Sequence, residues 1–238
     1  MHYVSILSTI VTLFFAVAVF ERYRRRKGAH LLLWGIGLVF YGLGTLTEAI
    51  MLFTFHPLAL KIWYLTGAML TAAWLGQGTL HLLVRKRGVV TILFALLVVV
   101  SVIAVALVLA APVGPVAYNL NEPASAQYKE ILVRSGAITF FTILLNINGT
   151  LTLVGGAIYS AYIFWRKHVL ADRMIGNILI AVGAMMPAMG GTFIRAGLAD
   201  WLYLSEFLGA VIMYVGFLRA TASQPAMEPQ SAAPASVS

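Results

Sequence analysis

The sequence predicts an all-α integral membrane protein with seven transmembrane helices, its N-terminus outside and its C-terminus inside. The first observation is composition, since 61% of residues are hydrophobic and only 10% are charged, whereas a soluble domain carries about 25% charged residues. Mean hydropathy is +0.92, so lipid must cover much of the surface. The second observation is seven apolar runs of membrane-crossing length, and the third is an uneven distribution of basic residues between them.

The apolar runs define the predicted helices in order, because about 20 mostly apolar residues cross the hydrocarbon layer. The seven runs cover residues 3–20, 31–54, 60–83, 89–111, 136–164, 175–198 and 202–220. The connections are short and polar, except for a predicted outer loop at 112–135. The membrane domain is therefore predicted to cover residues 1–222. A disordered cytoplasmic tail rich in Pro, Ala and Ser is predicted at 223–238.

Basic residues set the predicted orientation. Of the 16 Lys and Arg residues, 12 follow the first, third, fifth or seventh run. Because basic residues gather on the cytoplasmic side, the N-terminus is predicted outside, and the short loops fit a bacterial inner membrane. This asymmetry accounts for the net charge of +8, so membrane lipid is the predicted partner and nucleic acid is not. The first run is predicted as a retained helix, because a cleaved signal peptide has its basic residues before the apolar stretch.

Three pairs of segments resemble each other within the chain, one of them at the ends of the first and fifth runs, Phe20-Glu-Arg22 and Phe164-Trp-Arg166. GTLTEA at 44–49 matches GTFIRA at 191–196, and WYLTGAML at 63–70 matches LYLSEFLG at 202–209. The matches keep their order and their direction through the predicted membrane. They predict a parallel tandem repeat of three helices, one linker helix and three helices, with halves at about 1–87 and 136–222 and the linker at 89–111. Chance similarity between apolar helices is the alternative.

The repeat places two opposite charges at equivalent positions, Glu48 and Arg195. An unpaired charge at mid-bilayer costs roughly 3 kcal/mol, so such charges normally face inward and pair. The two side chains are therefore predicted to meet across a pseudo-twofold axis along the membrane normal. This pair would either help to bind a ligand or act only as a structural salt bridge between the two halves.

Aromatic and polar residues lie at a similar predicted depth to this pair. Helical spacing puts Tyr41, Thr45 and Glu48 on one face, and apolar walls with a few convergent polar groups are typical of small-molecule sites. The predicted ligand is a small polar or zwitterionic molecule entering from outside. The predicted ligand-binding residues are Glu48, Arg195, Glu206, Tyr41, Thr45, Tyr64, Tyr203 and Trp63.

A second group of residues is predicted either to form a polar path or to pack helices together. It comprises Asn146, Asn148, Gln77, His81 and Pro187. Pro187 is expected to kink its helix, since proline lacks a backbone donor. No metal site or cofactor is predicted, because the chain has no cysteine and its histidines lack metal-binding spacings. A retinal Schiff base on the rhodopsin pattern is excluded, because the seventh run contains no lysine.

The N-terminal third resembles a known pattern. It carries RYRRRKGAH before the second run, Trp34 early and Glu48 late within it, and KIWYLTGAML after it. This arrangement resembles the seven-helix sensor region at the N-terminus of some bacterial histidine kinases, which implies a ligand-sensing membrane module. The chain departs from that family in having no kinase, cyclase or PAS segment after the seventh run. The three-one-three layout is also similar to that of SWEET-type sugar carriers, without their Pro-Gln loop motif.

Four functions remain open from the sequence. A receptor-like protein would bind its ligand in a pocket closed toward the cytoplasm and act on a cytoplasmic or membrane protein partner. A small-solute carrier would need a polar passage from Glu48 through Asn146 and Gln77 to His81. A scaffold subunit would have the Glu48–Arg195 pair tightly packed with no cavity. An enzyme acting on lipid is the least supported, because no nucleophile elbow, P-loop or dinucleotide fingerprint occurs.

Overall fold

The computed structural model describes residues 3–167 and 171–221, apart from the side chains of residues 191, 194, 195, 199 and 200. It is 84% helical, and within the described ranges the only β-structure is an isolated bridge between Val113 and Leu132. Six of its helical segments are long and apolar enough to cross a membrane. The prediction of an all-α membrane protein is confirmed at this level, while the predicted tail at 223–238 lies outside the described residues.

The helices follow the predicted apolar runs closely. They are α1 (Val4–Arg26), α2 (Ala29–Met51), α3 (Pro57–Trp63), the π-helix η1 (Tyr64–Leu70), α4 (Thr71–Leu83), α5 (Arg87–Ala110), α6 (Ala124–Ile131), α7 (Gly136–Arg166), α8 (Ala171–Ala188), α9 (Gly190–Arg195) and α10 (Ala199–Thr221). α3, η1 and α4 join end to end, so the third run forms one rod over residues 57–83.

Local chemistry accounts for several helix ends. α1 ends at Arg26, and the C-cap residue Lys27 adopts a left-handed conformation with φ of 50°. Before α3, the His56 Nδ1 accepts a hydrogen bond from the Leu58 N–H at 3.2 Å, and Pro57 occupies the first helical position, where its missing donor costs little. Before α7, the Ser135 hydroxyl accepts from the Ile138 N–H at 3.3 Å, which is a regular N-cap.

Two segments differ from the predicted elements. The sixth run, 175–198, is divided, because α8 ends at Ala188 and α9 begins at Gly190. Pro187 lies in the last turn of α8 and removes a backbone donor at the break. α8 is not among the six helices long and apolar enough to cross a membrane by itself. The predicted outer loop at 112–135 contains a short helix, α6, which its polar composition did not reveal.

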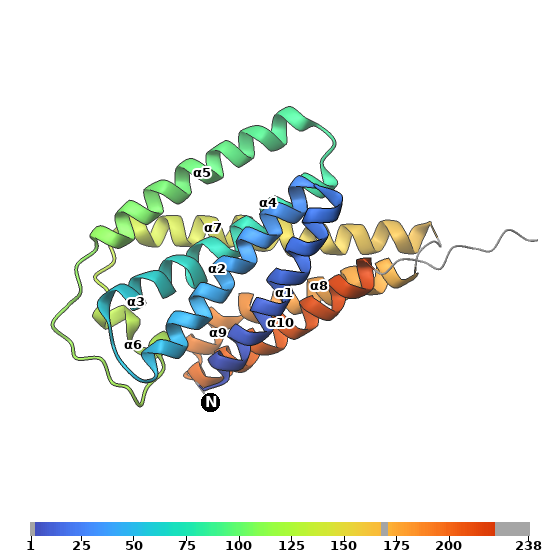
Figure 1. Ribbon diagram of the computed structural model, residues 1–238. Coiled ribbons are helices and arrows are strands. Elements are labelled where there is room, and N and C mark those ends of the chain that lie inside the picture. Colours follow the sequence, from blue (N-terminus) through green and yellow to red (C-terminus); the bar gives the residue numbers. More distant parts are fainter. Residues whose placement is uncertain (1–2, 168–170, 222–238) are drawn as a thin grey trace, which may run out of the picture.

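Six helices form a ring. Around the ring, each helix packs against the next in the order α1, α2, α4, α7, α8 and α10, and α10 packs against α1. α5 lies outside, against α4 and α7, and successive rods run in alternate directions along the bundle (Figure 1). Glycine permits the closest approach, since a Cβ on Gly183 of α8 would lie 2.8 Å from the Gly209 carbonyl oxygen of α10. Small residues at such contacts let membrane helices pack tightly.

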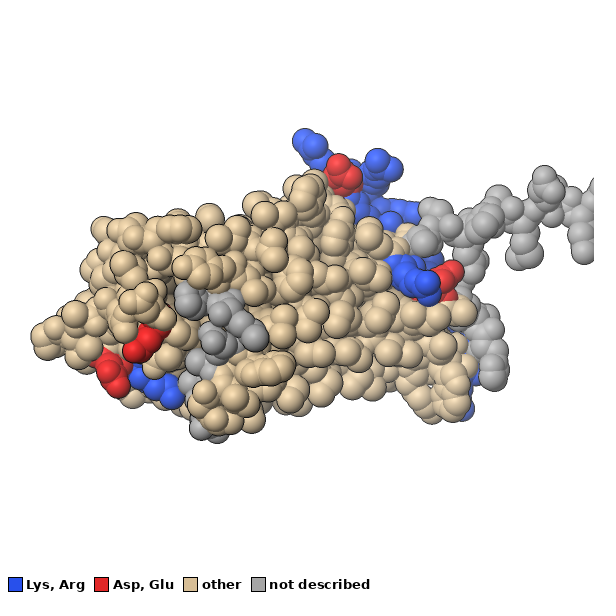
Figure 2. Space-filling model, turned by 90° about the horizontal axis from the view of Figure 1, so that it is seen from below, with Lys and Arg blue, Asp and Glu red and all other residues tan. Residues whose placement is uncertain are grey.

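On the face shown in Figure 2, the coloured charged side chains lie toward the two ends of the bundle, and the described side chains between them are uncharged. Most Lys and Arg gather at the end where α1, α4, α7 and α10 finish, here called the basic end. Lys61, Lys129 and Arg134 lie at the opposite end with Glu122 and Glu130. This separation of charged ends by an apolar band is what a membrane-embedded protein requires.

Candidate ligand-binding cavity

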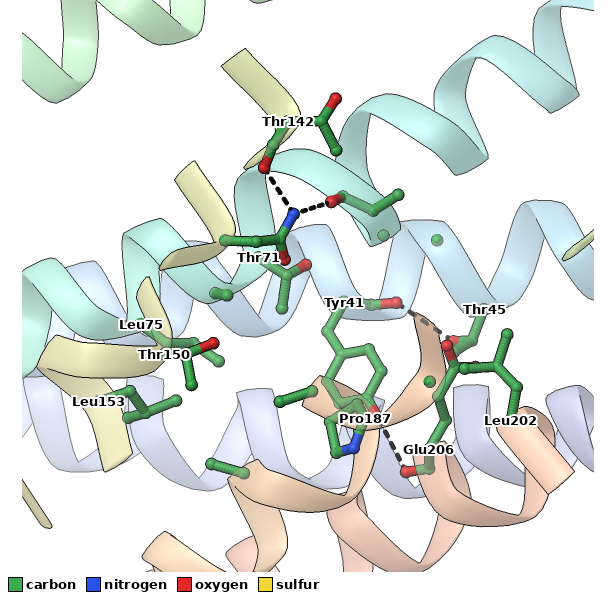
Figure 3. A pocket seen from close by; sticks show the side chains of 18 of the residues that line it. Tyr41, Thr45, Thr71, Leu75, Thr142, Thr150, Leu153, Pro187, Leu202 and Glu206 are labelled. Carbon is green, nitrogen blue, oxygen red and sulfur yellow. Dashed lines mark hydrogen bonds between the residues drawn. The ribbon is translucent and has the colours of Figure 1, made fainter. Parts of the chain in front are cut away.

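A cavity of about 640 Å³ lies inside the ring, among α2, η1, α4, α7, α8, α9 and α10. Its size falls within the range of small-molecule sites, about 300–1,000 Å³. Figure 3 shows it extending from Leu75, Thr150 and Leu153 at one end to Thr45, Leu202 and Glu206 at the other. It is lined by seven of the sequence-predicted residues: Tyr41, Thr45, Glu48, Trp63, Asn146, Pro187 and Glu206.

Glu48 is the most unusual residue of the cavity. Its side chain is 2% exposed, and neither carboxylate oxygen has a hydrogen-bond partner among the described residues. The Tyr203 hydroxyl and the Trp63 indole N–H lie close enough to interact with it electrostatically, without the geometry of a regular hydrogen bond. Burying a carboxylate without hydrogen-bond donors costs free energy. A bound group that donates hydrogen bonds to Glu48 would therefore stabilise it.

Glu206 on α10 brings a second carboxylate to the same cavity. It is half-buried and near enough to Glu48 for the two charges to repel each other. The Tyr41 hydroxyl donates to its backbone oxygen at 2.7 Å, a bond visible in Figure 3 that ties α2 to α10 across the ring. The Thr45 hydroxyl bonds to the Thr9 hydroxyl at 3.0 Å, so α1 is fixed to the same part of α2.

Aromatic residues from α3, η1 and α6 cover the cavity toward the opposite end. Trp63 and Tyr128 both line it, with their ring centroids 5.4 Å apart. Tyr64 packs at 5.6 Å from Tyr128. The Arg134 guanidinium lies 5.0 Å over the Tyr128 ring and donates to the Tyr64 hydroxyl at 3.5 Å. The group formed by Trp63, Tyr64, Tyr128 and Arg134 is here called the cover.

The connection before α6 adds to this end of the molecule. Tyr118 stacks on Phe55 with centroids 4.6 Å apart. Burial raises the pKa of Tyr118 to about 12, and the negative charge of Glu48 adds to the rise. The phenol is therefore neutral at physiological pH, and Tyr118 lies near enough to Glu48 to be influenced by it.

The π-helix η1 forms one wall of the cavity and exposes a backbone acceptor. Asn146 on α7 donates from its Nδ2 to the Ala68 carbonyl oxygen at 2.6 Å and to the Thr142 carbonyl oxygen at 2.8 Å. The Thr71 hydroxyl donates to the Thr66 carbonyl oxygen at 2.8 Å, which is one residue farther back than in an α-helix. Such π segments occur frequently at functional sites. Here Asn146 locks η1 to α7 beside the cavity.

The basic end of the cavity is closed by packed side chains. Leu75, Leu153 and Met213 line its floor and belong to a buried cluster with Phe15 and Phe217. Beneath the floor, the Trp34 indole donates to the Leu75 carbonyl oxygen at 3.0 Å and to the Thr79 hydroxyl at 3.2 Å. These residues separate the cavity from the basic end.

Five of the predicted residues are not among those that line the cavity. The Tyr64 hydroxyl bonds to Thr142 at 2.9 Å, and that of Tyr203 bonds to Ser125 at 3.1 Å. Gln77 Nε2 donates to the Val90 carbonyl oxygen at 3.2 Å, and the His81 Nδ1 lies 2.9 Å from the Gln77 carbonyl oxygen. Asn148 faces outward from α7. Gln77 and His81 do not line this cavity, and their predicted role in a polar path or in helix packing stays a prediction.

Arg195, the predicted partner of Glu48, ends α9. Its side chain lies outside the described residues, so the predicted pair stays a prediction. Sequence reasoning missed Tyr128, Thr142 and Arg134, which hold the cover together. The sequence carried a weak signal for Arg134 alone, since KEILVRSG at 129–136 places apolar residues between charges just before the fifth run.

No group of His, Cys, Asp and Glu able to hold a metal ion occurs within the part of the chain that the structure describes. The cavity offers two carboxylates, two phenols, one indole and several threonine hydroxyls, which suits non-covalent binding of a polar group. The chain matches no protein-family model, no curated protein and no solved structure.

Proposed function

We propose that this protein is a seven-transmembrane, receptor-like membrane protein that binds a small polar ligand in the cavity around Glu48. The carrying observation is a buried carboxylate with no hydrogen-bond partner among the described residues, in a cavity of about 640 Å³. An unpaired charge in a membrane interior costs roughly 3 kcal/mol. A ligand that donates hydrogen bonds to Glu48 would offset much of that free-energy cost. The burial of the Glu48 carboxylate therefore favours ligand binding.

The floor of the cavity supports a receptor over a carrier. Leu75, Leu153 and Met213 close the side toward the basic end. A ligand bound above them would change the packing of α2, α7 and α10 without passing through. We propose that this change is transmitted along the helices to a protein partner at the basic loops. A scaffold is less well supported, because a tightly packed structural pair would leave no cavity.

The ring order supports the proposed repeat of three, one and three helices. α1 packs on α2 and α2 on α4, just as α7 packs on α8 and α8 on α10. The two remaining contacts, α4 with α7 and α10 with α1, exchange under a twofold rotation, and α5 lies outside the ring as a linker would. With the basic end in the cytoplasm, this gives a protein with its N-terminus outside.

A small-solute carrier is the second candidate, and one observation favours it. α8 breaks beside the cavity, at Pro187 and Met189, and broken helices beside a binding site are a feature of transporters. A carrier would have to open the floor in another state. Uptake of bound ligand into vesicles distinguishes this function from that of a receptor, which binds without transport.

Thermal-shift screening of the purified full chain against small metabolites tests the proposal. A true ligand should raise the Tm of the parent in proportion to the logarithm of its concentration above Kd. Glu48→Gln should weaken this effect. Glu130→Gln, which removes an exposed carboxylate at the same end, should retain it. If no compound stabilises the parent and Arg195→Ala lowers its Tm, Glu48 and Arg195 form a structural pair and the receptor proposal fails.

A further inference from the structure

We infer that the ligand of this cavity is an amine-bearing amphiphile, with a cationic nitrogen held near Glu48 and Glu206 and an apolar tail that leaves sideways into the lipid. The inference rests on the proposed function and names the ligand class of that site. It combines the charge of the cavity with the direction in which the cavity reaches the surface.

The charge of the cavity favours a cation. The charged residue types in its described lining are both acids, Glu48 and Glu206, so the only charge that these side chains can bring to the cavity is negative. Arg134 is the nearest cation of the cover, and its guanidinium is engaged over the Tyr64 and Tyr128 rings at 5.8 and 5.0 Å. Among the described side chains, none brings a positive charge to either carboxylate. A ligand ammonium supplies the missing charge and hydrogen-bond donors.

Aromatic rings around the carboxylates suit the same group. Trp63, Tyr41 and Tyr128 line the cavity beside Glu48. The faces of indole and phenol rings attract cations, and more strongly where water is excluded. Carboxylates together with aromatic rings therefore select an ammonium group over a neutral alcohol or an anion.

The ends of the cavity leave a sideways route. The aromatic cover closes the opposite end, and the cluster around Leu75 closes the basic end. Toward the basic end, Val154 and Ala157 of α7 pack in one buried cluster with Ala181 of α8. Nearer the opposite end the facing side chains of α7 and α8 line the cavity instead. The gap between these two helices is the route to the lipid.

Apolar side chains line this route. Ile143, Ile147 and Leu151 of α7 all line the cavity, yet their side chains are 55%, 56% and 68% exposed. Ala188 of α8 lines it as well and is also exposed. A side chain that is both cavity-lining and exposed marks a place where the cavity meets the outer surface. Since that surface faces acyl chains, the occupant of the route must be apolar.

The test titrates the purified full chain, in a non-ionic detergent, with butylamine, octylamine and dodecylamine, and follows the Tm. Dodecanol and dodecanoate are the matched neutral and anionic probes. The apparent Kd should fall at least about tenfold from butylamine to dodecylamine, since each buried methylene adds to the affinity. The neutral and anionic probes should give no comparable stabilisation. A short-chain phosphatidylethanolamine tests membrane lipid as the source of the amine, whereas dodecylamine tests a free amine.

Two variants locate the effect. Glu48→Gln should weaken dodecylamine binding at least about tenfold, as loss of a buried charge partner does, whereas Glu130→Gln should not. Ile147→Trp, at a lipid-facing position that tolerates a large side chain, should weaken dodecylamine binding more than butylamine binding because it narrows the route. If tail-free metabolites stabilise the parent and alkylamines do not, the proposed function stands and this inference is wrong. If neither class stabilises it, both are wrong.

Discussion

At the scale of single residues, the chemistry of this protein centres on one carboxylate. Glu48 lies on a helix whose other buried residues are mostly Leu, Gly and Thr, and its oxygens lack partners among the described residues. A side chain that contributed only to packing would be replaced at a gain in stability by an apolar one. Retaining a costly group is typical of a functional site, where stability is given up for binding.

Replacing Glu48 with methionine tests whether this carboxylate lowers the stability of the protein while it contributes to ligand binding. In the absence of ligand, Glu48→Met should raise the free energy of unfolding by about 1–3 kcal/mol, because it removes an unsatisfied buried polar group. The same variant should abolish stabilisation by any ligand. Thermal unfolding in detergent measures both effects, with Glu130→Met as the exposed control expected to change stability by less than about 0.5 kcal/mol. A fall in Tm on Glu48→Met would mean that Glu48 already has a charged partner, for which Arg195 is the candidate.

At the scale of secondary-structure elements, η1 determines how the third rod meets α7. A π-helix inserts one extra residue into a helical turn, so the residues before and after it face different directions than a continuous α-helix would give. The Ala68 carbonyl that lies in this segment accepts a hydrogen bond from the Asn146 side chain. In lipid no water can replace that bond, so a single amide side chain on α7 secures the wall of the cavity.

Two asparagines on α7 allow a matched comparison. Asn146→Leu should destabilise the protein by about 1 kcal/mol, the usual value of an interhelical hydrogen bond in a membrane, and should also weaken ligand binding because the wall relaxes. Asn148→Leu changes the same residue type two positions away on the outward face and should be neutral or slightly stabilising. Paired Tm measurements check this. Equal effects of the two substitutions would show that Asn146 does not hold η1.

The helices and site residues differ in how well they could be predicted from the sequence. The long helices were predictable because an apolar run of membrane length leaves the backbone few alternatives. Glu48, Glu206 and Asn146 stood out as polar residues in apolar surroundings, and the structure brings all three to one cavity. The π-helix and the break after Ala188 were not predictable in detail, since each depends on a small energy difference within a helix. α6 escaped notice because eight mixed residues, ASAQYKEI, carry no clear period.

At the scale of the whole molecule, the ring accounts for why a cavity exists at all. Six rods arranged in a closed ring must fill a central space, and close glycine contacts hold α8 to α10 and α4 to α7. Those contacts fix the helix axes, so the centre cannot collapse where the facing side chains are small, as at Gly44, Gly67 and Ala184. The cavity is thus a property of the ring, while among the described side chains its charged groups are those of Glu48 and Glu206.

The arrangement of the ring in the membrane can be tested by labelling single cysteines introduced into the chain. The sequence contains no cysteine, so an introduced thiol is the one thiol of this protein that a maleimide can label. Lys86→Cys and Glu122→Cys provide the references, and we expect a membrane-impermeant maleimide added to intact cells to label only residue 122. The decisive pair is Lys167→Cys and Leu198→Cys, which lie on either side of the segment formed by α8 and α9. If that segment crosses the membrane, residue 198 is labelled from outside and residue 167 only after permeabilisation. If it does not cross, the two residues share one side and label together, and the parallel repeat that relates α8 to α2 is then excluded, because α8 would no longer run through the membrane as α2 does.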